Sequence, residues 1–417
     1  MIFNRRVLIL LSGLAFNLCL ASEGPAIVGT ETVERNFELN SYARDLGALQ
    51  EALGIAGFSK NIPDEYSDPT HGPLDFMLNA RQAPWAGNYF PMFKGGLANR
   101  WQTREKIDIE KLRDIKKSLR QLTPDQINRL SPIEKYDLYR GDYTFKSTLH
   151  ELHKRGPLRP LPVEEWEGFC NGVRCAGIHL PEPKHPITVA SRDGIPVTFQ
   201  PADLKALAGA SYFFVEKYSQ MGGPSFNDGH AQNQPNAAVF DLALRYYVAA
   251  KKAAFVIDSH LGSEIWNETV IGYKRDLLEP EPLTAEDEQL FPGAVSKRRV
   301  RLDLYSLADV SIRESNQSTK AKVAAGDYHK TTKTEYTLFL DSSGRAINGL
   351  WKKTRGLRGI DFVWFSGGRG TDSKNPQGNG NELLSFRTIS RLVKLSSQAL
   401  SCRQVLLNID DKKVGLK

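Results

Sequence analysis

The spacing of apolar residues along the chain predicts several helices. Apolar side chains recur every three or four residues over 106–122, which is the pattern of an amphipathic helix. Thr123 and Ser131 each precede a proline, and Gln126 or Glu134 follows three residues after the hydroxyl. This combination of cap, proline and capping-box partner predicts two helix starts. Further helices are predicted over residues 46–55, 201–218, 236–252 and 383–400.

Runs of β-branched and aromatic residues predict strands, all of them after residue 186. Asp193 and Gly194 separate two short apolar runs, which is the signature of a hairpin. A second hairpin is expected around residues 341–344. The predicted strands cover residues 187–190, 195–199, 253–259, 264–273, 335–340 and 347–351. Because helices and strands fall in separate blocks, the predicted fold class is α+β.

Composition predicts a globular protein that divides into four segments. The chain is 41% hydrophobic and 10% aromatic, with room for one large domain or two ordinary ones. The predicted segments are a signal peptide over 1–21, a helical and irregular N-terminal region over 22–160 that packs on the core, the core itself over 161–366, and a flexible stretch with a C-terminal helix over 367–417.

The first residues have the pattern of a secretory signal peptide. Arg5 and Arg6 form a short positive region, an apolar run follows over 7–20, and small residues precede a cleavage site after Ala21. The run is shorter than a membrane-spanning helix, so we expect a secreted or periplasmic protein without a stable membrane anchor. A lipoprotein signal centred on Cys19 is the alternative.

Charge and cysteine content argue against a nucleic-acid-binding protein and against a disulfide-stabilised scaffold. The net charge of +7 is modest and spread out, and no nucleic-acid-binding motif accompanies it. Without the predicted signal peptide, the chain has three cysteines, Cys170, Cys175 and Cys402, which are too few for a disulfide scaffold. A Cys175–Cys402 disulfide is one pairing to consider. The odd count leaves at least one thiol free or paired with another chain, which is the first indication of a nucleophile.

The sequence around Cys170 suits a reactive thiol. If a helix begins here, its unpaired backbone N–H groups favour a thiolate and can stabilise an oxyanion. Gly168 and Gly172 stand on either side, and we expect them to let a substrate backbone approach. The alternative is an inert, buried cysteine.

A thiol nucleophile needs a base and the base needs an orienting partner, and the chain offers several candidates. Asp258 and His260 are two residues apart at the end of a predicted strand, so their side chains should share one face. His230, in a glycine-containing loop, is a second candidate base. No His-x-x-x-His, Cys-x-x-Cys or EF-hand pattern indicates a metal site.

Several segments, in order, resemble the transglutaminase elicitor family of secreted oomycete and bacterial proteins. The resemblance runs from about Trp85 to Trp364 and implies a papain-like, transglutaminase-like cysteine enzyme fold, with 161–366 as the catalytic core and an N-terminal helical and irregular extension. The matching segments are PWAGNYFP at 84–91, GGLANRW at 95–101, LSPIEKYDL at 130–138, the region 166–183 around Cys170, FQPADLKAL at 199–207, IWNETVIGYK at 265–274, and the residues 336–341 and 361–364.

The resemblance implies a Cys-His-Asp triad. Carried over by position, Cys170 is the nucleophile and Asp258 the acid. The position of the base falls in 236–241, where this chain has Asp241 in place of histidine. A carboxylate is a poor base for a thiol because its pKa is several units too low. His230 or His260 would then supply the base, or the site is inactive; Asp241 would instead form a helix pair with Arg245.

Three functions follow from these observations. The first is an acyltransferase of the transglutaminase type, in which the Cys170 thiolate attacks a protein glutamine amide and an amine or water takes the acyl group. The second is a papain-like protease or amidase that prefers water. The third is a non-catalytic surface or recognition protein on the same fold. The expected partner is a protein or peptide that carries a glutamine, with an amine acceptor. The residues themselves indicate no required cofactor, whereas the resemblance implies calcium dependence.

Overall fold

The structure is a computed structural model, and parts of the sequence lie outside its description. It describes residues 30–108, 122–213, 215, 217–223, 234–352, 358–368, 370 and 381–398, with the side chains of 30–40 and 358 left out. Four features of the sequence analysis lie outside these residues: the expected signal peptide, most of the predicted helix over 106–122, His230 and Cys402. No helix in the described ranges combines the length and apolar character that crossing a membrane requires.

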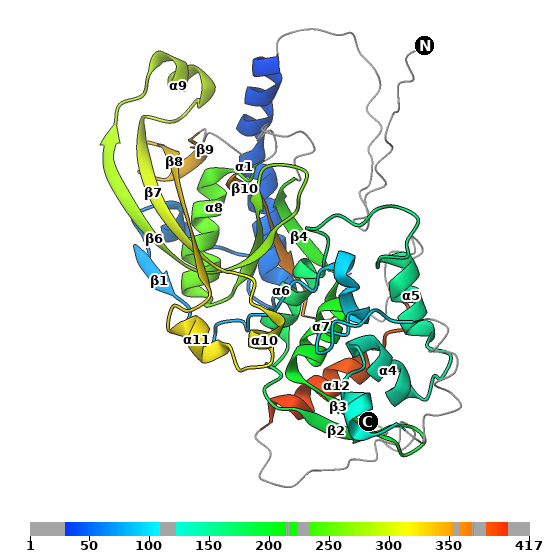
Figure 1. The fold of residues 1–417 in the computed structure, drawn as a ribbon. Helices are drawn as coiled ribbons and strands as arrows, with labels where there is room; N and C mark the ends of the chain where they lie inside the picture. Colours follow the sequence, from blue (N-terminus) through cyan, green and yellow to red (C-terminus); the bar gives the residue numbers. More distant parts are fainter. Residues whose placement is uncertain are drawn as a thin grey trace, which may run out of the picture.

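A large antiparallel sheet forms the centre of a mixed α/β fold (Figure 1). Its strands run in the order β4 (Tyr218–Gly222), β10 (Arg358–Ser366), β5 (Phe255–His260), β6 (Asn267–Glu281), β7 (Ser296–Leu307), β8 (His329–Leu340) and β9 (Ala346–Trp351), and β1 (Asp75–Met77) pairs with β6. β2 (Ile187–Ala190) and β3 (Pro196–Phe199) form a separate hairpin.

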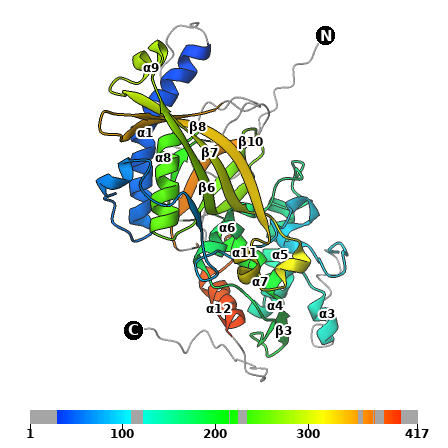
Figure 2. The same cartoon turned by 90° about the vertical axis from the view of Figure 1, so that its left-hand side faces the viewer.

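Helices cover both faces of the sheet. One face carries α1 (Thr30–Ile55) and α8 (Ala237–Leu242), which continues as a π-helix over Ala243–Ala250. The other faces α4 (Pro132–Arg140), α6 (Cys170–His179), α7 (Pro201–Tyr212) and α12 (Phe386–Ser397). Shorter helices are α3 (Pro124–Asn128), α5 (Lys146–Lys154), α9 (Ala285–Leu290), α10 (Ile312–Ser315) and α11 (Lys320–Ala324), with 3₁₀ turns at Asp64–Ser67, Met92–Lys94 and Gly96–Ala98. The long strands β6, β7 and β8 run from α9 to α11 (Figure 2).

The alternation of side chains along the central strands separates two hydrophobic cores. Phe255 and Ile257 belong to the core that contains α1 and α8, whereas Val256 between them belongs to the core that contains α6 and α7. Phe362 and Trp364 of β10 join Val256 on this second face. A residue's place in a strand therefore decides which core it enters.

Most predicted elements are present, and their ends differ where distant segments pair. Both predicted capping boxes, at Thr123 and Ser131, are confirmed, as are both hairpins. The helix predicted over 201–218 ends at Tyr212, because Tyr218 starts a strand that pairs with β10. The strand predicted over 264–273 starts at Asn267 and extends to Glu281, because β7 pairs with it along its length.

The glycines beside Cys170 serve packing. A Cβ atom on Gly172 would lie 1.9 Å from the carbonyl oxygen of Gly209 in α7, and one on Gly168 would lie 2.5 Å from the carbonyl oxygen of Tyr89. The expectation that they open a path for substrate is therefore wrong. They let α6 cross α7, and let the Tyr89 segment pass, at distances that any side chain would prevent.

Gly172→Ala should destabilise the fold and displace the start of α6. The added methyl group has backbone atoms on its far side, so the two helices must separate, at a cost of about 1–3 kcal/mol of unfolding free energy or more. Urea unfolding measures this loss. Gly47→Ala is the matched control, because Gly47 is an exposed α1 glycine with no atom within 4 Å of the added methyl. It should leave stability unchanged or raise it by about 0.5–1 kcal/mol. Equal stability of the two variants would contradict the packing argument.

Candidate functional site

Cys170 is the first residue of α6, as the sequence predicts for a reactive thiol. The N-cap residue is Phe169, which forms no side-chain capping hydrogen bond. Its backbone N–H donates to the carbonyl oxygen of Tyr89 at 2.6 Å. Within the described residues, the backbone N–H groups of Cys170 and Asn171 have no hydrogen-bond partner. The helix start therefore presents free donors next to the sulfur, although Cys170 itself is only 6% exposed.

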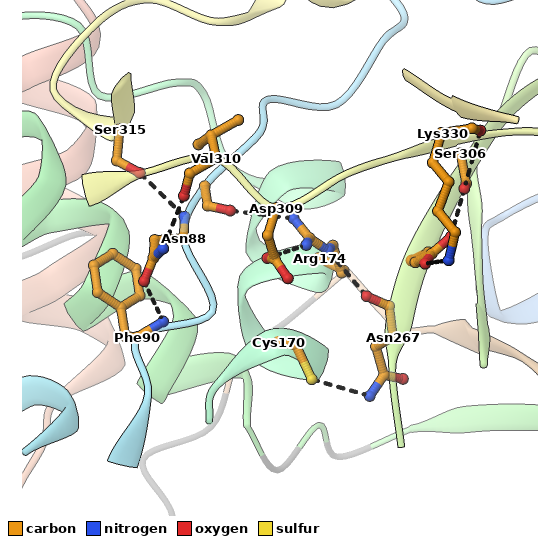
Figure 3. A network of polar contacts seen from close by, with 12 residues as sticks. Asn88, Phe90, Cys170, Arg174, Asn267, Ser306, Asp309, Val310, Ser315 and Lys330 are labelled. Atoms are coloured by element: carbon orange, nitrogen blue, oxygen red, sulfur yellow. Dashed lines mark hydrogen bonds and ion pairs between the residues drawn. The ribbon is translucent and has the colours of Figure 1, made fainter. Parts of the chain in front are cut away.

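The side chain that meets the sulfur is an amide. Asn267 Nδ2 donates to Cys170 Sγ at 3.4 Å (Figure 3). The thiol in turn faces the carbonyl oxygen of Ile265 at 3.9 Å. The other end of the amide is occupied, because Trp364 Nε1 donates to Asn267 Oδ1 at 2.9 Å. The first residue of β6 thus places a hydrogen-bond donor against the thiol.

Burial disfavours the thiolate form of Cys170. The pKa of Cys170 is raised, mainly because burial disfavours the thiolate, and the negative charge of Asp309 acts in the same direction. The hydrogen bonds from Asn267 and the charge of Arg174 oppose this shift without cancelling it. Cys170 therefore has a smaller thiolate fraction at pH 7 than a solvent-exposed cysteine.

Arg174, one helical turn after Cys170, connects the elements around the site. Its guanidinium donates to the carbonyl oxygens of Asn267 at 3.1 Å and Gly87 at 3.3 Å, and forms an ion pair with Asp309 (Figure 3). These contacts connect α6 with β6, with the segment before Tyr89 and with the turn after β7. The side chain is 1% exposed, so its charge acts in a buried setting.

Asp258 lies beside Asn267 but is engaged with the backbone. The two are cross-strand partners in β5 and β6, so their side chains share the face that meets α6. Asp258 Oδ1 accepts the backbone N–H groups of His260 at 3.1 Å and Trp266 at 2.9 Å. Oδ2 is buried and without a partner in the described part of the chain. Burial, with the charge of Asp361 adding to it, raises the pKa of Asp258 well above its usual value.

No histidine among the described residues hydrogen-bonds to the thiol. The ring of His260 points into its own turn, where Nδ1 accepts the backbone N–H of Gly262 at 3.3 Å. The partners of Cys170 Sγ are Asn267 and Ile265. His230 lies outside the described residues, so its assignment as base stays a prediction. Cys175 is fully buried in α6, and the pairing with Cys402 likewise stays a prediction.

The structure places Asp241 outside the Cys170 site, which corrects the expectation that it occupies the position of the base. Asp241 belongs to α8, on the opposite face of the sheet, and forms ion pairs with Arg245 at 2.8 Å and Arg275 at 2.7 Å. Tyr336 also donates to it at 2.5 Å. Burial alone would raise the pKa of Asp241, but the two guanidinium groups lower it overall. The alternative interpretation, a helix pair with Arg245, is confirmed.

Two half-buried aromatic rings flank the thiol. The ring centroids of Tyr89 and Trp266 lie 5.9 Å apart. Tyr89 belongs to the segment whose carbonyl oxygen binds the Phe169 N–H, and Trp266 stands between Ile265 and Asn267 in the chain. Burial raises the pKa of Tyr89, and the nearby carboxylates Asp309 and Glu165 add to this shift. No local pattern in the sequence associates Tyr89, Asn267 or Trp364 with Cys170, because each approaches from a different part of the chain.

The described residues do not assemble a calcium site. No group of three or more His, Cys, Asp or Glu side chains within the described ranges is arranged to hold a metal ion. Calcium prefers six to eight oxygen ligands, which such a group would have to supply in large part.

Replacing Asp241 should change stability and leave the thiol site unaltered. Asp241→Asn removes the charge that two buried guanidinium groups share, so we expect the free energy of unfolding to fall by about 3 kcal/mol or more. The pH dependence of Cys170 alkylation in the folded protein should not change. Asp276→Asn is the control, because its ion pair with Arg301 is 3.6 Å long and exposed; the expected loss there is below about 1 kcal/mol. A shifted alkylation profile in Asp241→Asn would place this residue in the site after all.

Comparison with known proteins agrees with the fold and with the resemblance in sequence. The crystal structure of the GP42 transglutaminase from Phytophthora sojae is similar, with a TM-score of 0.60 and 20% identity over 85% of this chain and 98% of that chain. At this identity the likeness shows the fold alone. No curated protein sequence matches the chain. The model of the transglutaminase elicitor family matches residues 71–399, which is most of the sequence. The chain therefore belongs to the transglutaminase elicitor family.

Proposed function

We propose that this protein is an exported, non-catalytic recognition protein on a transglutaminase-like fold, whose Cys170 site does not transfer an acyl group at neutral pH. The observation that carries the proposal is the hydrogen bond from Asn267 Nδ2 to Cys170 Sγ. Export rests on the signal-like sequence of residues 1–21.

An amide cannot replace an imidazole in acyl transfer. The reaction needs a group that removes the thiol proton and later returns a proton to the leaving ammonia. Asn267 Nδ2 has no basic lone pair, and Oδ1 is held by Trp364. The raised pKa of Cys170 adds to the lack of a base, because it lowers the fraction of molecules that carry a thiolate at pH 7. The described site therefore has the sulfur of a nucleophile without the means to ionise it.

Amine incorporation tests the recognition proposal. With a labelled primary amine and a glutamine-containing peptide at pH 7, the wild-type protein should incorporate no more label than Cys170→Ser. Asn267→His would place an imidazole between the sulfur and the unpartnered Oδ2 of Asp258, so this variant should gain incorporation. Asn267→Gln, which keeps the amide, is the matched control. Incorporation by the wild-type protein that Cys170→Ser abolishes would refute the proposal.

Two features favour a second candidate, the acyltransferase. The free backbone N–H groups of Cys170 and Asn171 could bind an oxyanion, and the unpartnered Oδ2 of Asp258 could orient an imidazole supplied by His230. In that mechanism the thiolate attacks a glutamine carboxamide carbon, the C–N bond breaks, and ammonia leaves with the proton that the imidazole took from the thiol. An amine then attacks the thioester, gives a proton to the imidazole and releases the thiolate. A protease or amidase would use water for this second step.

A histidine substitution separates the two candidates. If the protein is an acyltransferase, His230→Gln should reduce amine incorporation by about 100-fold or more, the usual contribution of a general base. His71→Gln is the control, because the carbonyl oxygen of His71 accepts from Arg245, on the α8 side of the sheet and away from Cys170. Release of ammonia without incorporated amine would indicate the amidase. Incorporation that survives His230→Gln would remove this residue from the mechanism.

A further inference from the structure

We propose that Trp364 is a positioning residue for Cys170: its indole N–H fixes the side-chain amide of Asn267 in the orientation that donates to the sulfur. Trp364 does not touch the thiol in this scheme and acts through Asn267 alone. The inference does not depend on whether the protein transfers acyl groups, because it concerns the chemistry of the thiol itself.

The orientation of an asparagine amide is set by its partners. The amide can present either its NH₂ group or its carbonyl oxygen to the thiol, and rotation by 180° exchanges the two. An indole N–H can only donate, so Trp364 Nε1 requires an oxygen opposite it, and at 2.9 Å it faces Asn267 Oδ1. The NH₂ group is then turned toward Cys170 Sγ, at 3.4 Å. With the indole N–H removed, the amide is free to turn its oxygen toward the S–H group.

The sheet keeps this arrangement rigid. Asn267 pairs with Asp258 across β5 and β6, and Trp364 pairs with Val256 across β10 and β5. Val256 and Asp258 are two residues apart in β5, on the face that meets α6. The indole of Trp364 crosses this distance to the side-chain amide of Asn267. Asn267 and Trp364 are 6% and 8% exposed, so water does not compete freely for either hydrogen bond. Arg174 holds the backbone oxygen of Asn267 as well.

The charge state of the thiol depends on the same amide. A donor aimed at sulfur favours the thiolate, and a carbonyl oxygen aimed at the S–H favours the neutral thiol. The other ionisable groups near the sulfur are Asp309, Arg174 and Tyr89, with Asp258 on the neighbouring strand. The indole N–H of Trp364 donates to Asn267 and to none of these groups. A substitution at Trp364 therefore isolates the effect of the amide orientation.

Trp364→Phe tests the proposal by removing the N–H while keeping an aromatic ring in the core. The rate of Cys170 alkylation by iodoacetamide is followed from pH 6 to 11 by peptide mass spectrometry. The midpoint of the profile should move up by about one pH unit, and the rate at pH 8 should fall roughly 5- to 10-fold, the loss expected for one hydrogen bond to a charged group. Trp351→Phe is the matched control, because Trp351 Nε1 donates to the carbonyl oxygen of Pro235, far from the thiol, and its profile should match the wild type.

A second background shows whether Trp364 acts through Asn267. Asn267→Ala should shift the profile in the same direction as Trp364→Phe, and adding Trp364→Phe to Asn267→Ala should shift it no further. An unchanged profile in folded Trp364→Phe, or a full additional shift in the double variant, would overturn the proposal. If Trp364→Phe does not fold, hydrogen exchange in the unmodified protein decides: a protected Trp364 indole N–H and a protected Asn267 NH₂ support the proposal, and rapid exchange of either contradicts it.

Discussion

The hydrogen bond between the Asn267 amide and the Cys170 sulfur decides what this site can do. It joins the first residue of α6 to the first residue of β6. A donor at this position stabilises negative charge on sulfur but takes no proton from it. The surrounding contacts make the arrangement hard to change, since Trp364 holds one end of the amide and Arg174 holds its backbone.

Close packing around the thiol has opposing consequences. Gly172 lets α6 approach α7, and Gly168 lets the Tyr89 segment lie against the residues before Cys170. The result is a well-defined position for the sulfur, which favours specific recognition. The same packing removes the thiol from water and raises its pKa, which disfavours attack on a carbonyl group. Precise placement and low reactivity therefore have a common origin in the helix crossing.

The central sheet separates two kinds of buried charge. On the α8 face, the carboxylate of Asp241 is matched by two arginines and a tyrosine, which is a structural network with its charges compensated. On the α6 face, Asp258 has one oxygen bound by two backbone N–H groups and the other without a partner in the described residues. The second arrangement leaves Oδ2 of Asp258 without a hydrogen-bond partner near the thiol. A buried polar atom without a partner is costly, so the two faces of the sheet differ in how well their buried carboxylates are satisfied.

Local signals in the sequence determined much of the architecture. The capping boxes at Thr123 and Ser131 and the Asp193-Gly194 hairpin all depend on residues within a few positions of one another. The alternation in β5 also placed Asp258 on one face of its strand. The family resemblance, carried by short motifs in order, agrees with the match to the family model. These features were predictable because they arise from spacing alone.

Only the tertiary structure decided which side chains meet the sulfur. Asn267 and Trp364 are 97 residues apart, and Asn267 lies 97 residues from Cys170, so no local pattern connects them. The same holds for Asp241, whose partner Arg245 is visible in the helical spacing while Arg275 and Tyr336 come from distant strands. Side chains from separate strands become neighbours through the order and register of the sheet. That register results from pairing over long distances in the chain, which the spacing of residues within a segment does not encode.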